Sequence, residues 1–146
     1  MRLAIGADHA GFEVKEKVKS FLAKEGHEVI DVGTNSAESV DYPDFAEKVA
    51  SSVKNKKADF GVLFCGTGIG MSMAANKIRG VRAAVCHNEH AAEMSRKHND
   101  ANVFCAGARV LSYDVIEKLL KLWLATPFEG GRHERRVSKI SNLDSK

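Results

Sequence analysis

The sequence predicts a doubly wound α/β fold, a Rossmann-like arrangement in which a five-stranded parallel sheet carries helices on both faces. Three observations lead to this fold class. Short apolar runs alternate with stretches of helical period, as they do in consecutive βαβ units. The middle run, Phe60 to Phe64, is almost entirely apolar, which is typical of a strand buried on both faces. Helical crossovers between successive strands require those strands to be parallel.

These patterns place each element in order. Strands are expected at 3–5, 29–32, 60–64, 83–85 and 103–106. The helices between them are expected to end before Gly26, to run from Pro43 to about 54, from 70 to about 77, from 89 to 98 and across 116–124. Ligands of such folds bind beyond the carboxyl ends of the strands. The chemistry is therefore expected in the loops that follow Ile5, Phe64, Val85 and Ala106.

The length of 146 residues predicts one domain spanning 1–146. Its segment 126–146 differs from the rest, because it combines basic residues with too few apolar ones to form a core element. We expect this tail to pack on a partner subunit. Twenty-two Lys and Arg against nineteen Asp and Glu give a net charge of +3, which is mild for a nucleic-acid binder.

The three cysteines are odd in number and far apart, so they form neither a disulfide framework nor a metal-binding pair of the Cys-x-x-Cys type. This usage favours a reducing compartment. No apolar stretch approaches the roughly 20 residues that span a bilayer, and no signal-peptide pattern opens the chain. The sequence therefore predicts a cytoplasmic protein that contacts no membrane.

A glycine-rich loop follows the central apolar run, and its sequence is Cys65-Gly66-Thr67-Gly68-Ile69-Gly70. Its backbone N–H groups, entering a helix, can converge on an anionic group. A tight turn chosen for geometry alone would use the same residues. The dinucleotide fingerprint and the phosphate-binding P-loop are both excluded, because Met71 replaces a required glycine and no Gly-Lys-Ser/Thr ending is present.

Cys65 differs from the other two cysteines. It lies at the end of a strand and directly before a helix, where the positive end of the helix dipole favours the thiolate. A thiolate there can attack a carbon or remove a proton. Cys86 and Cys105 have apolar neighbours and are predicted to be ordinary core residues.

Other candidate residues have equally plain structural interpretations. Asp8 and His9 follow the first strand and could face a ligand, although an Asp at that place also caps a helix. His98 and Asn99 could simply end a helix. Arg132 and Arg136 in the tail are four residues apart and could together bind a phosphate or form a solvated face. Arg109, just after the fifth strand, is a secondary candidate for the same role.

Four motifs together carry a resemblance: Gly6-Ala7-Asp8-His9-Ala10-Gly11, Cys65 to Ser72, Ala74-Ala75-Asn76-Lys77, and His98 to Val103. In order and spacing, over nearly the whole chain, they resemble the type B ribose-5-phosphate isomerases. That family also contains allose-6-phosphate and galactose-6-phosphate isomerases. The resemblance implies an aldose–ketose isomerase of the pentose phosphate pathway that needs neither cofactor nor metal.

Position by position, the resemblance also implies roles. Cys65 would be the base that moves a proton between C2 and C1, and His98 would open the furanose ring. Asp8 and Asn99 would hold sugar hydroxyls, while Thr67 and the backbone of Gly66, Gly68, Ile69 and Gly70 would stabilise the enediolate. His9, Arg132 and Arg136 would bind the phosphate.

The residues themselves are compatible with this chemistry, which needs a base, oxyanion donors and a remote anchor. Three alternatives stay open at this point: a six-carbon sugar phosphate as substrate, a nucleotide-binding regulatory module, and a basic protein that binds nucleic acid. The topology adds an expectation about assembly. The helix that begins after the fourth strand would carry His98 back to the sheet edge opposite Cys65. We therefore expect a homodimer with active sites shared between subunits, or a dimer of two such dimers.

Overall fold

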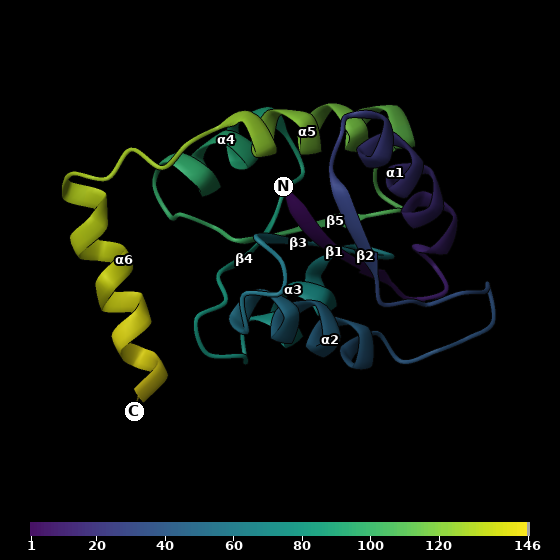
Figure 1. Cartoon of the computed structure of the whole chain (residues 1–146), viewed down its shortest axis with the longest axis horizontal. Helices are drawn as coiled ribbons and strands as arrows, with labels where there is room; N and C mark the ends of the chain where they lie inside the picture. The colour runs from purple at the N-terminus through teal and green to yellow at the C-terminus, as the bar shows by residue number, and fades with distance from the viewer. Residues whose placement is uncertain (146) are drawn as a thin grey trace.

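The computed structural model describes residues 1–145 and confirms the predicted fold class: five parallel strands with helices on both faces (Figure 1). The strands are β1 (Arg2–Ala7), β2 (Glu28–Asp31), β3 (Phe60–Cys65), β4 (Ala83–Val85) and β5 (Val103–Gly107). Their spatial order is β2-β1-β3-β5-β4. The chain therefore reverses its direction of travel across the sheet between β1 and β3, and doubly wound folds bind ligands at such a point.

The helices form two layers. Helices α1 (Phe12–Lys24), α4 (Glu89–Lys97) and α5 (Tyr113–Ala125) cover one face of the sheet, and α2 (Tyr42–Lys54) and α3 (Ile69–Ala75) cover the other (Figure 1). A last helix, α6 (Arg132–Asn142), is followed by a 3₁₀ turn at Leu143–Ser145. Among residues 1–145, no helix combines the length and the apolar character that crossing a membrane would require.

Each layer encloses its own apolar core, because successive side chains of a strand point to opposite faces of the sheet. Phe104 packs with Trp123 under α5, at a ring-centroid distance of 5.8 Å, while its neighbours Val103 and Cys105 face α2 and α3. Gly61 lets α2 approach closely, since a Cβ there would lie 2.5 Å from Val49 Cγ1. The buried cores hold the strand ends in fixed positions.

The element boundaries differ from the sequence predictions by up to three residues. The clearest case is α3, which ends at Ala75 and not near 77. Asn76 explains this, because its side chain forms two hydrogen bonds with the backbone of Ala83, donating to the carbonyl at 3.0 Å and accepting from the N–H at 2.7 Å. The amide thereby ties the helix end to the start of β4.

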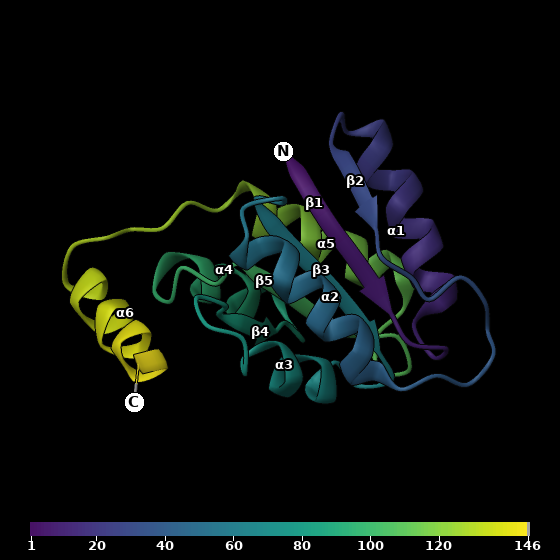
Figure 2. The same cartoon turned by 60° about the horizontal axis from the view of Figure 1, so that its bottom comes forward.

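The tail contains more regular structure than the sequence indicated. It forms the helix α6, which stands beside the layered body at the end of an extended connector (Figures 1 and 2). Within α6 only His133 is buried, and Ile140 in the helix and Leu143 after it are among the exposed apolar side chains. The expectation that the tail adds little to the core of its own subunit agrees with this arrangement.

Candidate active site

Three strand ends bring three of the four predicted loops together at the carboxyl edge of the sheet, and the loop after Val85 does not line the site. Ala7 pairs with Phe64 in register, and Cys65 pairs with Gly107. The loops that follow β1, β3 and β5 therefore meet, and beside them lies an open hollow of about 430 Å³. Asp8, Cys65 and the glycine loop line it, together with Tyr42 and Met73.

Cys65 lies at the base of this hollow with 5% of its surface exposed. The backbone N–H of Gly68 donates a hydrogen bond to its Sγ at 3.1 Å. Only glycine fits at position 68, because φ is +81° and a Cβ would lie 2.9 Å from the backbone carbon of Ala106. The loop thus turns back on the sulfur and presents a donor that can stabilise negative charge on it.

The other two thiols are in a different environment. Burial raises the pKa of Cys86 to about 11, against a weak opposing effect of the Ser95 hydroxyl. Burial also raises the pKa of Cys105 well above its usual value. Both remain protonated at neutral pH and pack in the core, as the sequence predicts.

Asp8 and His9 follow β1 directly, and hydrogen bonds fix the orientation of both side chains. Asp8 Oδ1 accepts hydrogen bonds from the backbone N–H groups of Ala10 at 3.0 Å and Gly11 at 3.1 Å, so this carboxylate both fixes the turn before α1 and lines the hollow. His9 Nδ1 accepts a hydrogen bond from the N–H of Val40 at 3.2 Å. A neutral His9 ring therefore carries its proton on Nε2, which leaves that nitrogen as a donor.

The glycine loop is held by its own contacts and by its neighbours. Thr67 is exposed, and its Oγ1 accepts a hydrogen bond from the N–H of Ile69 at 3.2 Å. The N–H of Arg109 donates to the carbonyl of Gly66 at 3.0 Å, so Arg109 stands beside the loop with an exposed side chain. Tyr42 packs against Gly70, and a Cβ at this position would lie 2.5 Å from the tyrosine ring and displace it.

Tyr42 is a residue that the sequence reasoning missed. It opens α2 directly before Pro43 and contributes its ring to the wall of the hollow. The sequence signal that could have identified Tyr42 is its place at the start of a helix, directly before Pro43. Its distance along the chain from the glycine loop concealed the contact.

His98 and Asn99 lie elsewhere. They end α4 and precede β5, whose first residue, Val103, pairs with Gly61 at the amino edge of the sheet. Cys65 pairs with Gly107 at the opposite end of the same ladder. Five residues of strand at about 3.3 Å each separate the two edges by roughly 13–16 Å. The expected separation of Cys65 and His98 within one chain is therefore present in the structure.

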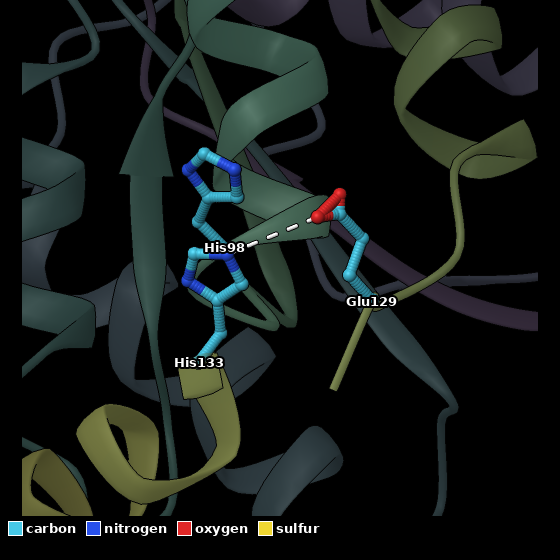
Figure 3. Close-up of side chains that lie close together, drawn as sticks. All are labelled: His98, Glu129 and His133. Atoms are coloured by element: carbon cyan, nitrogen blue, oxygen red, sulfur yellow. Dashed lines mark ion pairs between the residues drawn. The ribbon is translucent and has the colours of Figure 1, made fainter. Parts of the chain in front are cut away.

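His98 has a neighbour that the sequence did not indicate. Its ring stacks on that of His133 at a centroid distance of 4.1 Å and an interplanar angle of 14° (Figure 3). Glu129 Oε1 lies 3.8 Å from His133 Nε2. The ligand atoms of these three residues lie within 4.8 Å of one another, as in some metal sites. Nearly parallel rings, however, direct their nitrogen lone pairs side by side, whereas a bound ion requires them to converge.

The candidate residues thus form two groups in one chain. The carboxyl-edge group contains Asp8, His9, Cys65, Gly66, Thr67, Gly68, Ile69, Gly70 and Arg109. The amino-edge group contains His98 and Asn99, and α6 begins beside it with the exposed residues Arg132 and Arg136. The first group offers a base and an oxyanion site, and the second offers an imidazole and two guanidinium groups.

A hollow at the switch point of a doubly wound sheet, with a thiol at its base, is the arrangement of an enzyme that acts on a small molecule. The family model described as Ribose/Galactose Isomerase matches residues 3–140, and the chain belongs to this family.

Individual relatives are similar to this chain over nearly their whole lengths. The chain is 43% identical over 145 residues to Ribose-5-phosphate isomerase B of Escherichia coli strain K12, covering 99% of this chain and 97% of that protein. It is 40% identical over 141 residues to D-erythrulose-4-phosphate isomerase of Pectobacterium atrosepticum, covering 96% and 93%. The solved structure of Clostridium thermocellum Ribose-5-Phosphate Isomerase B superposes with a TM-score of 0.98 at 50% identity, covering 99% and 98%.

Proposed function

We propose that this protein interconverts D-ribose 5-phosphate and D-ribulose 5-phosphate through an enediolate intermediate. The observation that carries the proposal is the Cys65 sulfur, held by the Gly68 N–H at the base of the carboxyl-edge hollow and close to Asp8. Relatives named ribose-5-phosphate isomerase B, similar over nearly the whole chain, support the substrate. Three free cysteines support a cytoplasmic location for the single domain.

The residues divide the reaction into steps. His98 gives a proton to the ring oxygen as the bond from C1 to that oxygen breaks, and the C1 hydroxyl loses its proton to water and becomes a carbonyl. Cys65 then removes the proton from C2 and returns it to C1. Thr67 and the N–H groups of the loop 66–70 stabilise the enediolate oxygen. No step requires a metal or a cofactor.

The remaining residues hold the substrate. Asp8 and Asn99 accept and donate hydrogen bonds at the sugar hydroxyls, and His9 Nε2 donates to the phosphate. Arg132 and Arg136 supply its charge partners, and Arg109 is a further candidate because it stands beside the glycine loop. Binding energy at this charged end orients the reacting carbons over Cys65.

We also propose that one site is built from two chains. Cys65 and His98 lie at opposite edges of their own sheet, so one substrate can meet both only if His98 comes from a partner subunit. Exposed apolar side chains beside the Cys65 hollow support a contact there: Ile69, Met73 and Val110 are 45%, 65% and 55% exposed. Figure 2 shows α6 set apart from the layered body of its own chain, a position from which it could contact a partner subunit.

A coupled assay of purified, exhaustively chelated protein tests the function. We expect turnover of ribose 5-phosphate with a kcat/KM at least about tenfold above that for allose 6-phosphate or galactose 6-phosphate, because the relatives at 43% and 50% identity are named for ribose 5-phosphate. Faster turnover of a six-carbon sugar phosphate would reassign the substrate. Activity restored only by a divalent ion would contradict the metal-free mechanism.

The phosphate anchor makes a separate prediction. Arg132→Ala and Arg136→Ala are each expected to lose a charge-assisted contact of about 1.5–3 kcal/mol, which raises KM about tenfold or more. Steady-state kinetics measure this effect. Lys121→Ala is the control, because it removes an exposed positive charge from α5, and its KM should stay near that of the unmodified enzyme. Unchanged KM and kcat in both arginine variants would assign the two arginine side chains to solvent.

A further inference from the structure

The connector between α5 and α6 is fastened to the end of α4. Arg96 Nε donates a hydrogen bond to the carbonyl of Thr126 at 3.1 Å, and the N–H of Glu129 donates to the carbonyl of Lys97 at 3.1 Å. Gly130 and Gly131, with φ of 68° and 58°, then turn the chain into the first turn of α6. This path brings the first turn of α6 into contact with the residues at the end of α4.

His133 is the residue that this path delivers to His98. It is 6% exposed, although the rest of α6 is largely in solvent. Its ring is nearly parallel to the His98 ring, at a centroid distance of 4.1 Å (Figure 3). A buried side chain on an otherwise exposed helix indicates that the contact holds a defined geometry.

The charges around the pair favour a neutral His133. Burial lowers the pKa of His133, and the neighbouring His98 lowers it further. Arg132 and Arg136 act in the same direction, and Glu129 opposes them. The lowered pKa keeps the His133 ring neutral at neutral pH, so it adds no positive charge beside His98.

We propose that His133 is a positioning residue for ring opening: its stacked ring fixes the plane of the His98 imidazole, so that the acid nitrogen faces the furanose oxygen of the substrate. The inference rests on the proposed function and extends it to His133, a residue outside the carboxyl-edge and amino-edge groups. A neutral His133 adds no competing acid beside His98. His98 gives a proton to the ring oxygen, which keeps the electrons of the broken bond to C1, and then regains a proton from water.

The test separates ring opening from proton transfer at carbon. Ribulose 5-phosphate has no free hydroxyl that can close a furanose ring, so deuterium exchange at its C1 in D₂O requires Cys65 and no ring opening. We compare His133→Ala, which removes the stack, with His133→Phe, which keeps a flat ring. For His133→Ala we expect kcat with ribose 5-phosphate to fall about tenfold or more, while C1 exchange followed by NMR stays within about twofold of the unmodified enzyme. His133→Phe should recover most of the lost isomerisation.

Three results would overturn the inference. One is normal isomerisation by His133→Ala. The second is an equal fall in isomerisation and exchange in that variant, since this would indicate damage to folding or to substrate binding. Circular dichroism distinguishes these two, because only damaged folding changes the spectrum. The third is a His133→Phe variant as impaired as His133→Ala, which would exclude stacking as the contribution. Failure of the proposed function itself is distinguishable, because the unmodified enzyme would then show neither isomerisation nor exchange.

Discussion

Cys65→Ala is expected to lower kcat for ribose 5-phosphate by about 10²–10⁴-fold, the usual contribution of a positioned base, with little change in KM. The substitution removes the only group at the base of the hollow that we assign to proton transfer from C2. It leaves the phosphate anchor and the loop donors in place. Stopped-flow or coupled steady-state assays of the purified variant measure the loss.

Two kinds of matched variant show whether the loss is chemical. Cys65→Ser keeps the shape of the side chain and can still accept from the Gly68 N–H, but its hydroxyl does not ionise at neutral pH, so it should be nearly as inactive as Cys65→Ala. Cys86→Ala and Cys105→Ala remove buried thiols that play no part in the reaction. They should keep turnover and lower the free energy of unfolding by about 0.5–3 kcal/mol. Near-normal turnover by Cys65→Ala would assign the base to another residue.

Much of the fold followed from the sequence, because a parallel sheet buried on both faces leaves a strong pattern. The apolar run of β3 and the helical period of α5, with Trp123 and Leu120 on its inner face, identify buried elements without knowledge of their partners. The spatial order of the strands could not be predicted in this way. It depends on which helix packs on which face, and that depends on close contacts such as Gly61 against Val49.

The carboxyl-edge group was also predictable, since parallel strands end at a common edge and Cys65 follows one of them. The details that adapt Cys65 to its proposed role were not. The hydrogen bond from the Gly68 N–H and the packing of Tyr42 on Gly70 depend on loop conformation and on distant segments. Tyr42 carries no motif of its own, and only the folded chain brings it to the hollow.

The amino-edge group was predictable only in part. Counting helical residues from Glu89 correctly placed His98 on the edge away from Cys65. The stack of His98 on His133 could not be inferred, because the tail has the composition of a solvated segment and the one buried residue of α6 is placed by the connector's hydrogen bonds to α4.

The separation of the two groups leads to the second large expected effect, which concerns mixed dimers. Cys65→Ala and His98→Ala homodimers should each be strongly impaired, because every site lacks one of its two proton-transfer groups. A mixed dimer with two-fold symmetry contains one doubly defective site and one site with both groups intact. Neither variant protein is active alone, yet a mixture after subunit exchange is expected to recover activity.

Complementation between these variants is therefore the measurement that tests the shared active site most directly. Equal amounts of the two proteins are unfolded, mixed and refolded, and mass spectrometry confirms that chains have exchanged. Random pairing makes about half of the dimers mixed, and half of the sites in those dimers are intact, so activity should reach roughly a quarter of the unmodified enzyme. No recovery, in a sample whose chains have demonstrably exchanged, would show that Cys65 and His98 do not act on one substrate across two subunits.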